Sequence, residues 1–150
     1  MKILFINAVS PLNEVESRYP GLGLAYLASS LRANFEKKYF ELKIVERGGK
    51  SEVMDEILAF KPDIVCISSV TKNFSLAEKY ARFSKGKNIP VLMGGVHISM
   101  FPMSLPEEAD AACIGEGEQT IVELVKIFKE KRIFEKKELS RVSAICSSIS

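Results

Sequence analysis

The sequence is poor in the residues that most often carry acid–base and metal chemistry. It has a single histidine, His97, and three cysteines, Cys66, Cys113 and Cys146. The cysteines lie too far apart for a metal motif, and their odd number argues against a disulfide framework. Nucleophilic hydrolysis has no support either, because no Gly-x-Ser-x-Gly motif is present. We therefore assign no catalytic residue and no metal ligand.

Long apolar runs and concentrated positive charge are also missing. The apolar start of the chain, Ile3-Leu4-Phe5-Ile6, is too short for a signal peptide or a membrane span, so we expect a reduced, cytoplasmic protein with no membrane partner. The net charge is only +2. Because the basic excess lies in residues 129–141, the body of the chain has no basic face, and we expect no nucleic-acid partner.

Short apolar runs alternate with amphipathic segments along the first 132 residues. The runs predict strands at residues 2–9, 39–46, 64–68, 89–94 and 110–114. Helical spacing predicts helices at residues 21–35, 50–60, 75–85 and 118–128, the third starting with a capping box at Ser75 and Glu78. Residues 98–108 read as an irregular loop.

This alternation predicts a doubly wound α/β fold. We expect a parallel, flavodoxin-like, five-stranded sheet in the order 2-1-3-4-5, with helices on both faces. The half-exposed second strand fits an edge position. Residues 1–132 form the predicted domain. Residues 133–150 form a tail, for which an extra strand, a frayed end and the start of a missing catalytic domain are the open alternatives.

Glycine and serine gather where three predicted strands end. Gly94-Gly95 follows the fourth strand, Ser68-Ser69 ends the third, and Gly115-Glu116-Gly117 follows the fifth. Ligands of open α/β sheets bind at such carboxyl ends. A phosphoacceptor receiver domain is excluded, because no carboxylate ends the first or third strand. Gly21-Leu22-Gly23 is a weak match to a dinucleotide motif, since a long loop separates it from the first strand; we assign these glycines to the start of the helix and its packing.

Four motifs, at residues 20–28, 61–68, 94–99 and 115–120, occur in register at these strand ends. Together they resemble the amino-terminal cobalamin-binding domain of cobalamin-dependent radical SAM proteins, over residues 1–132. The resemblance implies a corrin above the carboxyl ends of the strands and a nucleotide tail beside the sheet. It implies the following cofactor-binding residues: Ser10, Ser68, Ser69, Thr71, Gly94, Gly95, Val96, His97, Gly115, Glu116 and Gly117.

The chain departs from the family's motifs in two places. The Asp-x-His-x-x-Gly motif that supplies a lower histidine ligand is absent from residues 7–12, which implies cobalt without a protein imidazole. His97 follows the wrong strand for that role, so we interpret it as a rim residue; the alternative is that it only hydrogen-bonds its own loop. No Cys-x-x-x-Cys-x-x-Cys motif is present, so we expect no iron–sulfur cluster and no catalysis by this chain alone.

A radical SAM catalytic domain, in cis or in trans, is the partner that the resemblance implies. Two other functions stay open. One is a flavodoxin-like interaction module that has lost its ligand and forms a homodimer through the second strand or the tail. The other is a module that binds a different phosphate-bearing cofactor at the glycine loops.

Overall fold

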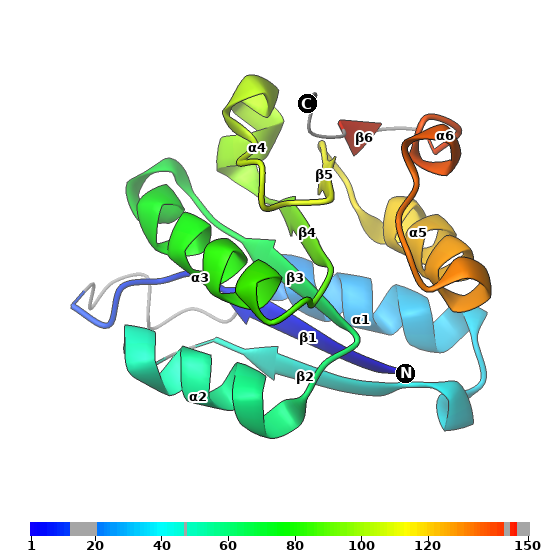
Figure 1. Ribbon diagram of the computed structural model, residues 1–150, viewed down its shortest axis with the longest axis horizontal. Coiled ribbons are helices and arrows are strands. Elements are labelled where there is room, and N and C mark those ends of the chain that lie inside the picture. Colours follow the sequence, from blue (N-terminus) through cyan, green and yellow to red (C-terminus); the bar gives the residue numbers. More distant parts are fainter. Residues whose placement is uncertain (13–20, 47, 143–144, 147–150) are drawn as a thin grey trace.

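A sheet of six strands lies between two layers of helices in the computed structural model, which describes residues 1–12, 21–46, 48–142 and 145–146 (Figure 1). The strands are β1 (Lys2–Asn7), β2 (Glu41–Val45), β3 (Ile64–Ser68), β4 (Val91–Gly94), β5 (Ala111–Cys113) and β6 (Ile145–Cys146). Their order is β2-β1-β3-β4-β5-β6, and β1 to β5 are parallel. The predicted order 2-1-3-4-5 is confirmed. The short β6 adds an antiparallel strand beyond β5.

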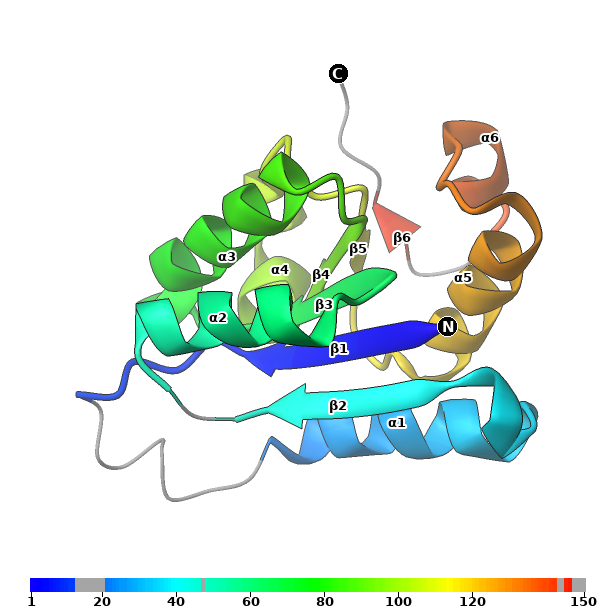
Figure 2. The same ribbon diagram turned by 60° about the horizontal axis from the view of Figure 1, so that its bottom comes forward.

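The helices cover both faces of the sheet, as predicted. They are α1 (Leu22–Asn34), α2 (Lys50–Phe60), α3 (Phe74–Gly86), α4 (Val96–Met100), α5 (Glu118–Lys131) and α6 (Lys136–Leu139), with 3₁₀ turns η2 (Lys37–Tyr39), η3 (Thr71–Asn73) and η4 (Pro102–Ser104). Helices α2 and α3 pack on one face, and α1 and α5 pack on the other (Figure 2).

The alternation of side chains along β1 explains why two layers of helices are needed. Leu4 and Ile6 face the α2–α3 layer, whereas Ile3 and Phe5 face the α1–α5 layer. All four side chains are fully buried. Burial of each such side chain contributes roughly 1.5–3 kcal/mol, so a strand of this composition is stable only with both faces covered.

Two local predictions were wrong. Residues 98–108 are not wholly irregular, because α4 and η4 occupy part of them. Gly95, at φ 96°, turns the chain so that α4 can start directly after β4. The capping box at Ser75 does not form, because η3 runs straight into α3 and places Ser75 inside the first turn of the helix.

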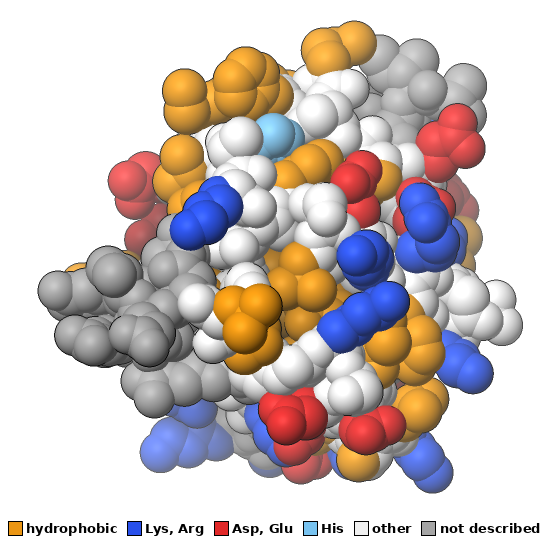
Figure 3. Space-filling view, turned by 90° about the vertical axis from the view of Figure 1, so that its left-hand side faces the viewer, with side chains coloured by type: hydrophobic (Ala, Val, Ile, Leu, Met, Phe, Trp, Pro, Cys, Tyr) orange, Lys and Arg blue, Asp and Glu red, His pale blue; other side chains and the backbone are white. Residues whose placement is uncertain are grey.

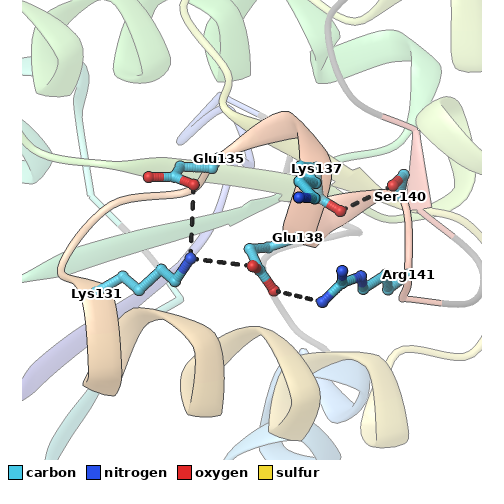
Figure 4. Close-up of polar contacts among 6 residues, drawn as sticks. All are labelled: Lys131, Glu135, Lys137, Glu138, Ser140 and Arg141. Atoms are coloured by element: carbon cyan, nitrogen blue, oxygen red, sulfur yellow. Dashed lines mark hydrogen bonds and ion pairs between the residues drawn. The ribbon is translucent and has the colours of Figure 1, made fainter.

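The segment after α5 packs back onto that helix. Leu139 is buried in the α1–α5 core, and the Phe134 ring lies 5.2 Å from the Phe128 ring. Lys131 forms ion pairs with Glu135 and Glu138, at 3.6 and 3.0 Å (Figure 4). Hydrogen bonding from Lys131 lowers the pKa of the Glu138 carboxyl.

In the described ranges, none of the helices combines the length and the apolar character that a bilayer crossing requires.

Substitution of Gly95 should destabilise the fold. A Cβ at this position would lie 2.7 Å from Ser68 Oγ and 2.7 Å from the Ser69 carbonyl oxygen, at a φ that favours glycine. We expect Gly95→Ala to lower the free energy of unfolding by about 2–4 kcal/mol in urea titrations, from backbone strain and overpacking together. Gly86→Ala, at the end of α3 where a Cβ meets nothing within 4 Å, is the matched control and should be neutral or stabilising. Equal midpoints for the two variants would contradict this account.

The tail should be held to α5 by apolar packing more than by its ion pairs. We expect Leu139→Ala to cost about 2–3 kcal/mol in the same assay, because it leaves a cavity in a buried cluster. Glu138→Gln should change stability little at neutral pH, because its ion pairs are exposed to solvent. The small contribution of Glu138 is present above its ordinary pKa and is lost as the pH falls through its lowered pKa, so this variant and the wild type should converge in acid. A larger loss from Glu138→Gln than from Leu139→Ala would reverse this assignment.

Candidate functional site: a glycine-lined cavity at the strand ends

A cavity of about 360 Å³ opens at the carboxyl ends of β3, β4 and β5, between the sheet and the pair of helices α1 and α5. Its volume lies in the range of small-molecule sites. Mostly buried apolar side chains form its inner wall: Leu24, Leu27, Ile121 and Leu124 from the helices, and Cys66 and Leu92 from the sheet. The site therefore combines an apolar interior with a mouth made of strand-end loops.

Glycine is concentrated around this cavity. Five of the nine glycines in the chain line it, namely Gly23, Gly94, Gly95, Gly115 and Gly117. A Cβ added at Gly23 or Gly115 would meet no atom within 4 Å, so these two positions border open space. Side chains there would extend into or across the mouth, and their absence lets a ligand approach the backbone.

Gly117 has a different role, because it permits close packing. A Cβ there would lie 3.0 Å from Leu27 Cδ2 and 3.1 Å from Cys113 Sγ. Both of those side chains line the cavity. A larger residue at position 117 would therefore displace these two cavity-lining side chains.

The polar groups of the lining belong mainly to the mouth. Ser68 ends β3, Glu116 is exposed, and Glu118 is half-buried at the start of α5. These two carboxylates are the charged side chains among the described lining residues. A group with several negative charges would be repelled by such a mouth.

Two thiols face the same cavity. Burial raises the pKa of the Cys66 thiol well above its usual range. Burial also raises the pKa of Cys113, an effect partly offset by a hydrogen bond with Thr120 and reinforced by the charge of Glu118. Both thiols are therefore protonated at neutral pH and poor nucleophiles.

His97, on α4, lies outside the lining of this cavity and contacts residues of η3, α3 and η4. Its Nδ1 lies 3.1 Å from Thr71 Oγ1 and its Nε2 lies 3.0 Å from Ser104 Oγ. Ser104 Oγ donates its proton to the Phe101 carbonyl oxygen, at 2.7 Å, and therefore accepts from Nε2–H. In the neutral imidazole, Thr71 Oγ1 then donates to Nδ1. The ring also stacks on Phe74, with centroids 3.9 Å apart, so both nitrogens and one ring face are occupied.

The structure brings six of the eleven predicted cofactor-binding residues to the cavity: Ser68, Gly94, Gly95, Gly115, Glu116 and Gly117. The other five lie outside its lining. Thr71 and His97 contact each other, and Val96 is exposed on α4. Ser69 is buried, and its Oγ has no hydrogen-bond partner among the described residues. Ser10 lies beyond β1, where its Oγ accepts from the Leu12 amide at 3.4 Å.

Sequence reasoning missed the helical half of the cavity. Leu24, Leu27, Ile121 and Leu124 follow the helical spacing of ordinary core residues, so nothing in the sequence marks them as cavity lining. The assignment of Gly23 to helix packing was wrong, because a Cβ there would meet no atom within 4 Å and the residue borders the cavity. Its neighbour Gly21 does pack closely, because a Cβ there would lie 3.2 Å from Asn7 Nδ2.

The surface around the strand ends is partly apolar. Figure 3 views the molecule from the side toward which β1, β2 and β3 point, and hydrophobic side chains gather on its upper part, over α4. Val96, Met100, Phe101 and Met103 all expose about half or more of their surface in this region. An apolar rim of this kind suits a ligand or partner with a large non-polar face.

Comparison with known proteins identifies the family. The sequence model of the family described as B12 binding domain matches residues 10–125. An uncharacterized methyltransferase of Pyrococcus horikoshii is 35% identical over 143 residues, which cover 88% of this chain and 31% of that protein. The anaerobic magnesium-protoporphyrin IX monomethyl ester cyclase of Rubrivivax gelatinosus is 32% identical over 140 residues, covering 88% of this chain and 25% of the cyclase.

The chain thus spans about a quarter to a third of the length of these curated relatives. The matched residues include β3, β4 and β5, whose ends form the glycine-lined mouth of the cavity. The resemblance drawn from the four strand-end motifs is confirmed at the level of the domain. The chain belongs to the B12-binding domain family.

Proposed function

We propose that this chain is a cobalamin-binding module, with the nucleotide tail in the cavity beside α1 and α5 and the corrin against the strand-end surface. The observation that carries the proposal is an apolar, glycine-lined cavity at the carboxyl ends of β3, β4 and β5 in a chain of this family. When bound, cobalamin supplies a cobalt centre for group-transfer or radical chemistry.

Residues of the inner wall and residues of the mouth have different roles in binding. The aliphatic inner wall takes up a flat heteroaromatic base and excludes water from it. Gly94 and Gly95 line the cavity at the end of β4, and Gly115 keeps the opposite side of the mouth free of side chains. The Ser68 hydroxyl stands at the mouth, within the lining, as a hydrogen-bonding group for the tail.

Cobalt is held without a protein imidazole. His97 is the only histidine of the chain, and both of its ring nitrogens are engaged by hydroxyl groups. Its 9% exposure leaves little of the ring accessible. Ligation by His97 would require both hydrogen bonds and the stacking on Phe74 to be lost.

The two other functions raised by the sequence have less support. A free nucleotide or another polyphosphate would meet Glu116 and Glu118 at the mouth without a compensating cation in the described lining. An interaction module that had lost its ligand would have no need to keep a cavity whose walls are spaced by Gly117.

A catalytic domain of the radical SAM type, in cis or in trans, is the proposed partner. The relatives named a methyltransferase and a cyclase are three to four times longer than the part that this chain matches. The exposed apolar surface of α4 and η4 adjoins the strand ends, where such a domain would face the corrin.

Blocking the cavity mouth should weaken cobalamin binding without unfolding the protein. We expect Gly23→Phe to weaken binding of hydroxocobalamin at least about tenfold, because the new ring enters open space at the mouth. Retention of the coloured cofactor after desalting, followed by spectrophotometric titration, measures the effect.

Gly86→Phe is the matched control, because Gly86 also borders open space but lies at the far end of α3, outside the cavity. It should bind like the wild type, and both variants should unfold at similar urea concentrations. A wild-type protein that emerges colourless from the column would overturn the proposed function. Equal binding by both variants would overturn the placement of the tail.

The bound cofactor should have no nitrogen ligand on cobalt. After reduction to the cob(II)alamin state, the electron paramagnetic resonance spectrum should lack the nitrogen triplet splitting, because the tail base is in the cavity and His97 is engaged. Protein labelled with ¹⁵N is the control. A triplet that becomes a doublet on labelling would identify a protein imidazole. A triplet unchanged by labelling would show the cofactor's own base on cobalt, contrary to the proposal.

A further inference from the structure

We infer that the cavity discriminates among corrinoids by the base at the end of their tail, and that it prefers a benzimidazole to a purine. The inference rests on the proposed function, and it concerns the chemistry of the cavity's inner wall.

The inner wall offers a buried base almost no hydrogen-bonding partner. Its buried and half-buried apolar side chains from α1 and α5 are aliphatic. The polar lining residues of these two helices are Tyr26, which is 59% exposed, and Glu118, which is half-buried at the start of α5. The backbone groups of the sheet are also committed, because β3 pairs with both β1 and β4 in register through Cys66 and Ile67. Strand β4 likewise pairs with both β3 and β5 at Leu92 and Met93.

The two thiols do not change this character. Burial keeps Cys66 and Cys113 protonated, and a neutral thiol is a weak donor and a weak acceptor. Cys113 is further engaged with Thr120. The stronger polar groups among the described lining residues are the hydroxyls of Ser68 and Tyr26 and the carboxylates of Glu116 and Glu118. Ser68 ends β3, Tyr26 and Glu116 are exposed, and Glu118 is half-buried at the start of α5, so these groups belong to the mouth.

The two classes of base differ in how many polar atoms they bring into such a wall. A benzimidazole that has left the cobalt carries one free ring nitrogen and a hydrocarbon ring. A purine such as adenine carries two more ring nitrogens and an amino group. Glu118 could accept from the amino group, but a carboxylate cannot donate to the ring nitrogens. A polar atom buried without a partner loses its hydration, and this penalty is larger than the gain from an ordinary hydrogen bond.

The consequence is a measurable preference for one class of corrinoid. We expect cobalamin, whose base is dimethylbenzimidazole, to bind at least about tenfold more tightly than the corresponding cobamide with an adenine base. The preference should reside in the tail alone, since the corrin rings of the two ligands are the same.

Titration of the full chain with three corrinoids tests this inference: cobalamin, the adenine-tailed cobamide, and cobinamide, which lacks the nucleotide. The expected order of affinity is cobalamin, then the adenine-tailed cobamide, then cobinamide. Equal affinities for the two tailed ligands, both above that of cobinamide, would overturn the selectivity and leave the proposed function intact. Failure of all three to bind would overturn the proposed function, and the inference with it.

A pair of variants at one position of the inner wall tests the mechanism. Cys66→Ser adds a hydroxyl that can donate and accept, whereas Cys66→Ala removes the thiol without adding one. We expect the affinity ratio of cobalamin to the adenine-tailed cobamide to be smaller in Cys66→Ser than in Cys66→Ala. The same ratio in both variants would overturn the role assigned to the apolar wall, and the wild-type titration stands if either variant fails to fold.

Discussion

The turn between β4 and α4 packs against the end of β3 so closely that no side chain fits between them. Gly95 makes this contact possible, because a Cβ there would collide with Ser68 Oγ and with the Ser69 backbone. The same approach lets the His97 amide donate to the Ser69 carbonyl oxygen, at 3.3 Å. Once this amide is fixed, the imidazole reaches Thr71 and Ser104 and joins η3, α4 and η4 into one unit. The arrangement of η3, α4 and η4 therefore depends on the absence of a side chain at position 95.

The two faces of the sheet use their strand ends differently. On the α2–α3 face, Ile98 and Phe74 extend the core as far as the His97 ring, which stacks on Phe74. Side chains therefore close the strand ends on this face. On the α1–α5 face, glycines replace side chains and the core opens into the cavity. The ends of the same strands are thus closed by side chains on one face of the sheet and open into the cavity on the other.

The strand order and the position of the site follow from local patterns, whereas the cavity wall does not. Apolar runs and the glycines that end them are properties of short segments, so β1 to β5 and the loops at Gly94 and Gly115 were predictable. A leucine such as Leu124 looks the same in sequence whether it packs against a side chain or borders a void. The environment of His97 could not be predicted from the sequence either, because its partner Thr71 lies 26 residues away in the chain. The strand β6 has only two residues and pairs only because β5 offers a free edge.

The edges of the sheet have a consequence for how molecules of this chain meet one another. Strand β5 is covered by the short antiparallel β6, which offers very little backbone for further pairing. The opposite edge, β2, carries Glu41 and Lys43, and Lys43 is held by Glu56. Short strands and charged side chains are the features by which natural sheets resist edge-to-edge aggregation. Concentrated solutions of this domain should therefore resist fibre formation through the edges of its sheet. Association between copies would then involve the exposed apolar surface at the strand ends.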